Sequence, residues 1–144
     1  MLDIKRLSAA DAAVLVEASI KASNDIGIPM CIAVTDESGN LIAFERMDGG
    51  KISSISIAID KAFTGAAARN PTHVYNELCQ PGKPTFGIHI TNGGHFSIIG
   101  GGYPVTLGGV VVGGVGISSG TAAQDREVAE AALASFYAST GYTA

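Results

Sequence analysis

Apolar positions recur at helical spacing through the first part of the chain, beginning just after Ser8 and ending at Gly27. Spacings of three and four residues place these positions on one face of an amphipathic helix. Ser8 is a favourable N-cap with Asp11 three residues later, and Gly27 is typical of a helix C-terminus. The pattern then becomes extended, with runs over 30–36 and 41–47 separated by a polar turn. We expect one helix followed by a β-hairpin.

A second helical pattern covers residues 53–69, and its apolar face is formed by Ile55, Ile59, Ala62, Phe63 and Ala66. Asn70-Pro71 ends this helix and starts a short one over 71–78, because Asn caps helices well and Pro is tolerated at the first helical position. Residues 80–84 form a loop. A last helix, capped by Thr121, extends to about residue 139.

Residues 86–91 and 95–99 flank the sequence Asn92-Gly93-Gly94, which is a strong hairpin signal. With a three-residue loop, apolar side chains on the two strands oppose one another, whereas a two-residue loop would set Ile90 against His95. We therefore expect two strands with the longer loop. The same register places four polar side chains on one face of the hairpin: His89, Thr91, His95 and Ser97.

Glycine is concentrated between residues 100 and 120, which hold nine of the chain's 19 glycines. No Asp, Glu, Lys or Arg occurs between Lys83 and Asp125. A segment this apolar is buried, and its glycines let other backbone come close because they have no Cβ. We expect two central strands, over 103–107 and 110–118, pressed against helices or a neighbouring subunit. The glycine spacing does not match a dinucleotide-binding or serine-hydrolase motif.

With 144 residues and no linker or internal repeat, the chain is expected to form a single domain over residues 1–144. Consecutive hairpins covered by helices are typical of the α+β class with an antiparallel sheet. Only 15% of the residues are charged and 47% are hydrophobic, whereas about 25% are charged in an average soluble domain. A monomer would expose apolar surface, so we expect a homo-oligomer.

The formal net charge is −4, and the nine Lys and Arg residues form no run. This argues against nucleic acid or an anionic membrane surface as a partner. The N-terminus lacks the apolar stretch of a signal peptide, and glycines and Pro104 interrupt the uncharged segment 96–118. We expect a cytoplasmic protein. Cys31 and Cys79 stand apart in the sequence, as two buried and reduced thiols would.

Several motifs along the chain resemble those of one known family, and they occur in the family's order. They are Ala33-Val34-Thr35-Asp36 followed by Gly39, Arg46-Met47-Asp48-Gly49, Lys61-Ala62-Phe63-Thr64, Gly101-Gly102-Tyr103-Pro104, and Val112 to Gly120 with Asp125. Together they cover nearly the whole chain, which resembles the GlcG/HbpS-like proteins. These are also called the haem-degrading domain family, and they occur as the C-terminal part of PduO-type proteins.

The resemblance implies a profilin-like fold, with a five-stranded antiparallel sheet and helices on both faces, and homo-oligomers of up to eight subunits. It also implies a bacterial protein, often encoded beside genes for glycolate or diol use. The implied ligand is a small molecule, haem or a corrinoid, with weak haem degradation at most. In some haem-binding relatives a histidine on the first helix contacts the haem, whereas this chain has no histidine before His73.

A haem site needs an axial ligand, an apolar slot and cations for the propionates. His89 and His95 are the candidate axial ligands, because the predicted hairpin places both near the glycine segment. The alternative is that each makes a hydrogen bond at a sheet edge or at a subunit contact. Two histidines alone do not form a zinc site, so we predict no metal site.

Further candidate ligand-binding residues occupy the family motifs, beginning with a predicted polar cluster of Arg46, Asp48, Lys61 and Thr64. In this cluster Arg46 and Lys61 could hold a carboxylate. Alternatively, Arg46 and Asp48 form an ion pair and Lys61 extends its amine to solvent. Ser118 begins a corner that could cradle an anion at the start of the last helix. Asp125 lies in the first turn of that helix, where the dipole favours a carboxylate.

The sequence identifies no catalytic residue, and it leaves two alternatives to a haem-binding or corrinoid-binding protein. The first is an accessory enzyme that acts on a small hydroxy-acid, diol or aldehyde metabolite through Arg46 and Lys61. The second is a structural subunit without a ligand.

Overall fold

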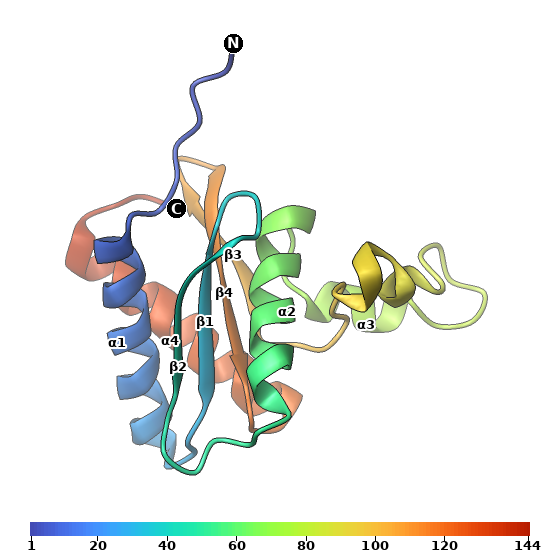
Figure 1. Ribbon diagram of the computed structural model, residues 1–144, viewed down its shortest axis with the longest axis horizontal. Coiled ribbons are helices and arrows are strands. Elements are labelled where there is room, and N and C mark those ends of the chain that lie inside the picture. The colour runs from blue at the N-terminus through green and yellow to red at the C-terminus, as the bar shows by residue number, and fades with distance from the viewer.

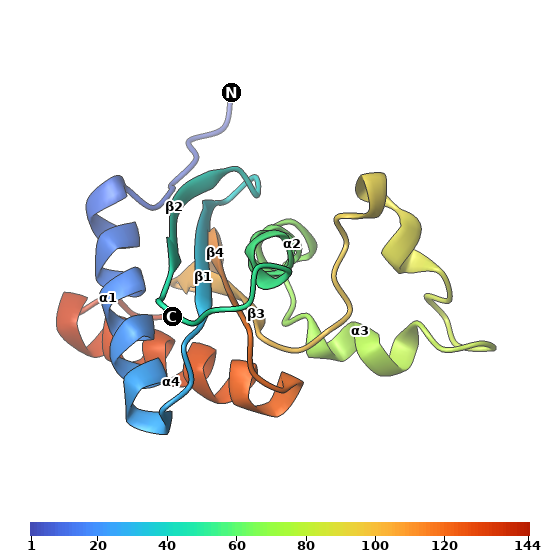
Figure 2. The same cartoon turned by 60° about the horizontal axis from the view of Figure 1, so that its bottom comes forward.

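A four-stranded antiparallel sheet lies between two layers of helices (Figure 1). The computed structural model describes residues 1–144. The strands, in the spatial order β2-β1-β4-β3, are β1 (Cys31–Asp36), β2 (Leu41–Arg46), β3 (Gly102–Leu107) and β4 (Val110–Ser118). One face of the sheet is covered by α1 (Ala9–Ile26) and α4 (Ala122–Thr140), and the other by α2 (Ser54–Ala68) (Figure 2). The predicted α+β class is confirmed, and none of the helices has an apolar stretch long enough to cross a membrane.

The ends of α1 and α4 follow the capping signals in the sequence. The Ser8 hydroxyl accepts a hydrogen bond from the Asp11 N–H at 3.1 Å, and the Asp11 carboxylate accepts one from the Ser8 N–H at 2.9 Å. Thr121 and Gln124 form the same reciprocal pair at the start of α4. Gly27 ends α1 in the left-handed conformation, with φ 71°. These local contacts explain why α1 and α4 begin, and α1 ends, where the sequence predicts.

The main hydrophobic core fills the space between the sheet and the pair α1 and α4. Its largest buried side chains alternate along the strands and meet one face of each helix; they include Leu15, Ile32, Val34, Val115, Ile117, Val128 and Phe136. The opposite face of the sheet packs against α2 through much smaller residues, namely Cys31, Ala33, Ala58 and Ala62. Small side chains on both sides of this interface allow α2 to approach the sheet closely.

Glycines in β4 make this close approach possible. A Cβ on Gly116 would overlap the Ala58 carbonyl oxygen, and a Cβ on Gly114 would overlap the carbonyl oxygen of Ala62. The prediction that the glycine segment presses against a helix is therefore confirmed, with α2 as that helix. Of the two strands predicted in this segment only β4 is central, however, because β3 forms one edge of the sheet.

Residues 73–99 form an arm that projects from the α2 side of the sheet (Figure 1). The arm contains α3 (His73–Leu78) and two 3₁₀ turns, η1 (Ile88–Ile90) and η2 (Asn92–Gly94). The hairpin predicted over residues 86–91 and 95–99 is wrong. The sheet consequently has four strands, not the five that the family resemblance implied.

Local backbone geometry explains why the arm does not form strands. Three glycines adopt left-handed conformations with φ between 65° and 83°, namely Gly87, Gly93 and Gly94. The N–H groups of Ile88 and Ile90 bond to carbonyl groups three residues earlier, so they are not free for a neighbouring strand. Phe86 and Ile90 remain 66% and 73% exposed. The alternating apolar pattern in this segment therefore buries no face of a sheet.

Candidate functional site

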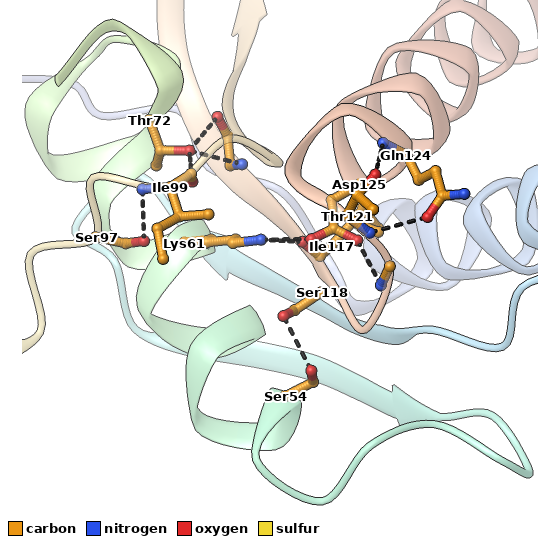
Figure 3. A network of polar contacts seen from close by, with 12 residues as sticks. Ser54, Lys61, Thr72, Ser97, Ile99, Ile117, Ser118, Thr121, Gln124 and Asp125 are labelled. Atoms are coloured by element: carbon orange, nitrogen blue, oxygen red, sulfur yellow. Dashed lines mark hydrogen bonds and ion pairs between the residues drawn. The ribbon is translucent and has the colours of Figure 1, made fainter. Parts of the chain in front are cut away.

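Lys61 and Asp125 form an ion pair inside the protein (Figure 3). From α2, the Lys61 Nζ donates to Asp125 Oδ2 at 2.8 Å and to the Ile117 carbonyl oxygen at 2.9 Å. Asp125, in the first turn of α4, accepts through Oδ1 from the Gly120 N–H at 2.9 Å. The Lys61 and Asp125 side chains are only 1% and 3% exposed. One buried pair thus joins α2, β4 and α4.

Burial and pairing act on the Lys61 amine in opposite directions. Burial lowers the pKa of Lys61 below its ordinary value of 10.5, while the hydrogen bond and the charge of Asp125 oppose this lowering. The expectation that Lys61 extends its amine to solvent is wrong. The buried pair also leaves Lys61 unable to reach a ligand on the surface beside Arg46, so the predicted carboxylate clamp does not form. Asp125 pairs with Lys61 in addition to its expected place at the start of the helix.

Gly101 packs directly against this ion pair. A Cβ at this position would lie 2.6 Å from the Ile117 carbonyl oxygen, 2.8 Å from Asp125 Cβ and 3.1 Å from Lys61 Nζ. Its φ of 122° is a conformation that other residues rarely adopt. The motif residues Lys61, Gly101 and Asp125, although far apart in sequence, therefore share one structural role.

Two buried threonine hydroxyls hold the end of the arm where it returns to the sheet, and Figure 3 shows the contacts of Thr72. Thr64, on α2, accepts a hydrogen bond from the Ser97 N–H at 2.8 Å. Thr72 accepts from the Gly102 N–H at 3.0 Å and donates to the Ile99 carbonyl oxygen at 2.6 Å. Thr64 is one of the predicted ligand residues, but its hydroxyl bonds to backbone groups and positions the arm instead.

His95 lies at the end of the arm beside α2, where it pairs with a carboxylate. Its Nδ1 lies 2.7 Å from Asp60 Oδ1. The imidazole is 66% exposed, whereas the Asp60 side chain is 25% exposed. In the neutral imidazole, an Nδ1–H that donates to the carboxylate leaves Nε2 with a lone pair and no proton. That lone pair can bind a metal ion or accept a hydrogen bond from a ligand.

His89 has a different neighbour and does not join His95. Its Nδ1 lies 3.1 Å from Cys79 Sγ, within the arm itself. Neither histidine makes a hydrogen bond to residues 100–120. The prediction that both histidines share one face beside the glycine segment is therefore wrong, because the hairpin that would have aligned them does not form.

Arg46, Asp48 and Ser118 lie at one end of the sheet, and Arg46 and Asp48 do not form the predicted cluster with Lys61 and Thr64. Arg46 and Ser118 occupy the strands on either side of β1, and both are in register with Cys31. Arg46 and Asp48 are exposed and make no ion pair with each other. The buried Ser118 hydroxyl donates to Ser54 Oγ at 3.1 Å, so it is directed at α2 instead of at an anion.

A polar cluster that the sequence did not reveal lies where α3, β3 and α4 meet. The Tyr103 hydroxyl donates to the Glu130 carboxylate and accepts from Arg126 Nε at 3.4 Å. The His73 ring lies 5.8 Å from the Tyr103 ring, and its buried Nδ1 has no hydrogen-bond partner. Burial lowers the pKa of His73 and raises the pKa of Tyr103. An open groove of about 290 Å³ beside the cluster is lined in part by His73, Asn76 and Arg126.

Asp60 is a further residue of the site that the sequence did not reveal. It precedes the Lys61-Ala62-Phe63-Thr64 motif and lies 35 residues from His95. The signal that could have found it is a carboxylate outside the apolar face of the predicted helix, one turn before Thr64 on α2. Only the return of the arm to α2 brings it to the imidazole.

Similarity to known proteins identifies the family. A family model described as "Haem degrading protein HbpS-like" matches residues 7–134. The chain belongs to the HbpS-like family. This HbpS-like chain is 41% identical to an uncharacterized 15.0 kDa protein in the dhaT-dhaS intergenic region of Citrobacter freundii. That match spans 112 residues, which are 78% of this chain and 79% of that protein.

Two further HbpS-like relatives carry functional descriptions. The corrinoid adenosyltransferase PduO of Salmonella typhimurium is 30% identical over 88% of this chain, which spans only 38% of the length of PduO. The crystal structure of the PduOC:heme complex superposes with a TM-score of 0.86 at 30% identity, covering 90% of this chain and 94% of that chain. This HbpS-like protein therefore shares its fold with a relative that has been crystallised with haem.

Proposed function

We propose that this HbpS-like protein binds haem, with His95 as the iron ligand and Asp60 orienting the imidazole. The observation that carries the proposal is the 2.7 Å contact between His95 Nδ1 and Asp60 Oδ1 on an imidazole that is 66% exposed. Metal-binding histidines use one ring nitrogen for the metal while the other donates to a carboxylate or a carbonyl group. The haem complex of the related PduOC supports haem as the bound group.

His95 fits this role better than His89, the other predicted axial ligand. The neighbour of His89 Nδ1 is the Cys79 sulfur at 3.1 Å. Sulfur is a weaker hydrogen-bond acceptor than a carboxylate, so it holds the Nδ1–H tautomer less firmly. We therefore assign iron ligation to His95 alone.

The arm also offers the apolar surface that a porphyrin requires. Phe86, Ile90 and Ile99 are 66%, 73% and 45% exposed. Burying one such side chain against a flat ring would contribute on the order of 1.5–3 kcal/mol. Arg46 is the exposed cation in the predicted set that could meet a propionate, since Lys61 lies in the interior.

Bound haem would supply a redox-active iron, and the protein's part is to bind and orient it. Weak haem degradation belongs to this proposal because the family is described by that activity. A corrinoid is the alternative ligand, which the similarity to a corrinoid adenosyltransferase supports. An axial imidazole on His95 would serve either ring system.

A haemin titration of the purified protein tests the proposal. We expect a saturable shift of the Soret band with the wild-type protein and affinity about 10–100-fold weaker with Asp60→Asn, which removes the carboxylate behind the ligand. His95→Ala should abolish the shift. His89→Ala, on the same arm, is the matched control and should titrate like the wild type. Circular dichroism spectra of all four proteins verify that they fold alike.

The outcomes of the titration test haem binding and the choice of iron ligand separately. The absence of a Soret shift in the wild-type protein would refute haem binding, and cobalamin titrated in the same way would then test the corrinoid. A His95→Ala protein that titrates like the wild type would refute the ligand assignment while leaving haem binding intact. An affected His89→Ala with an unaffected His95→Ala would transfer the role to His89.

The rival hypothesis, an accessory enzyme for a small metabolite, relied on Arg46 and Lys61 together. Because Lys61 is only 1% exposed and paired with Asp125, Arg46 would have to hold the anion alone. A thermal-shift screen with hydroxy acids, diols and aldehydes tests it, since a ligand that binds the folded state raises apparent stability. If neither this screen nor the haemin titration gives a response, the ligand-free structural subunit becomes the better description.

We also propose a homo-oligomer in the cytoplasm. Besides the arm, Ile52 and Val110 are 76% and 61% exposed, and apolar side chains in such numbers favour association between copies. Light scattering coupled to size-exclusion chromatography measures the subunit number. A strictly monomeric mass at micromolar concentration would contradict this part of the proposal.

A further inference from the structure

The two cysteines of the chain lie in contrasting surroundings. Cys31, in β1, is fully buried, its Sγ lies 3.6 Å from the Lys51 carbonyl oxygen, and burial raises the pKa of its thiol. Cys79 follows α3 on the arm and is 6% exposed. Its Sγ lies 3.1 Å from Nδ1 of His89, whose own side chain is exposed. Only Cys79 therefore has a base within reach of its proton.

We propose that Cys79 is a nucleophilic thiol with His89 as its base, and that small hydroperoxides convert it to a sulfenic acid. A thiol in hydrogen-bond contact with an imidazole is an arrangement that activates cysteine as a nucleophile. Nothing in this proposal requires haem, since His89 is not the assigned iron ligand.

The reaction balances without a further reactant. The thiol proton moves to His89 Nδ1 while the sulfur attacks one oxygen of the hydroperoxide. The S–O bond forms as the O–O bond breaks, so that sulfur loses two electrons and the peroxide gains them. The departing oxygen takes the proton from His89 and leaves as water or an alcohol.

The position of the pair on the arm determines which reagents reach it. An exposure of 6% at Cys79 admits only small molecules while the arm stays closed. The elements of the arm make few contacts with the sheet, and Ile90 next to His89 is 73% exposed. Segments with few buried contacts open locally at low free-energy cost. Small electrophiles are therefore the class that this site selects.

Alkylation by iodoacetamide, followed by peptide mass spectrometry, compares the two thiols in the intact folded protein at neutral pH. We expect Cys79 to react at least about tenfold faster than Cys31, because only Cys79 is both reachable and paired with a base. His89→Asn should slow alkylation of Cys79 by about tenfold or more through loss of the base. His73→Asn, a histidine of α3 without a contact to Cys79, is the matched control and should leave the rate unchanged.

Hydrogen peroxide with dimedone, which traps sulfenic acids, tests the oxidation itself. Dimedone should label Cys79 in the wild-type protein and label it less in His89→Asn. In Cys79→Ser the peptide that contains residue 79 should carry no label. A His89→Asn substitution that merely loosened the arm would expose Cys79 and speed its alkylation, so a slower rate reports the base. Equal alkylation of Cys31 and Cys79, an unchanged rate in His89→Asn, or no dimedone label at Cys79 would each overturn the proposal.

Discussion

Asp125→Asn isolates the charge of the buried ion pair, because it keeps the size of the side chain and leaves the Lys61 ammonium without a counter-charge. The two side chains are 1% and 3% exposed, so water does not replace the lost partner. Removing one member of a buried pair costs about 3–5 kcal/mol of stability. A domain of this size has a free energy of unfolding of about 5–15 kcal/mol. We expect urea unfolding of this variant to show a loss of about 3 kcal/mol or more.

The pH dependence of this loss has a definite sign. Burial lowers the pKa of Lys61 and Asp125 opposes the lowering, so removing the carboxylate leaves burial unopposed. The unfolded chain then binds more protons than the folded variant between that lowered pKa and the ordinary value of 10.5. Stability rises with pH wherever the unfolded state binds more protons. The difference between Asp125→Asn and the wild type should therefore shrink as the pH rises from neutral toward 10.5.

Two further variants test whether the loss of a buried counter-charge causes the destabilisation. The exposed pair Lys21 and Asp25, with side chains 75% and 62% exposed, provides the matched control. Asp25→Asn should cost less than about 0.5 kcal/mol. The double variant Lys61→Met/Asp125→Leu should recover much of the lost stability, because apolar residues of similar volume can replace a buried pair. A loss below about 1 kcal/mol in Asp125→Asn would show that Lys61 is not held as a buried ammonium.

Two further predictions concern the packing of α2 and the attachment of the arm. Gly116→Ala should destabilise the fold by about 1–3 kcal/mol or more in urea unfolding, because its Cβ would overlap the Ala58 carbonyl oxygen. Thr72→Val should cost about 1–3 kcal/mol, since it leaves the buried Gly102 N–H and Ile99 carbonyl group without their partner hydroxyl. In Thr72→Val, amide hydrogen exchange should also become faster across the arm and remain unchanged in β1.

Controls for these two substitutions lie elsewhere in the chain. In Gly141→Ala the added Cβ would meet no atom within 4 Å, and only the left-handed φ of 71° disfavours alanine. Its loss of stability should therefore stay at about 1 kcal/mol. Ser139→Ala removes a hydroxyl that bonds to the Phe136 carbonyl group near the end of α4 and should leave exchange in the arm unaltered. A Gly116→Ala protein as stable as Gly141→Ala would contradict the close packing of α2 on β4.

The elements with local signals were predictable from the sequence. The capping boxes at Ser8 and Thr121, and the hairpin over β1 and β2, depend on residues within a few positions of one another, and the structure confirms them. The hairpin predicted around Asn92 failed because the same glycines that favour a tight turn also permit successive 3₁₀ turns. Alternating apolar residues specify a strand only where a sheet is present to receive them.

The candidate site was likewise only partly predictable from the sequence. The sequence by itself determined which residue types were present at Lys61, His95 and Asp125, and the family motifs include Lys61 and Asp125. Only the tertiary structure decided their roles, because Lys61 meets Asp125 across 64 residues and His95 meets Asp60 across 35. A charged side chain is a surface ligand or a buried structural contact according to the water around it and the partner beside it. Both depend on how α2, the arm and α4 pack together, which local sequence patterns do not specify.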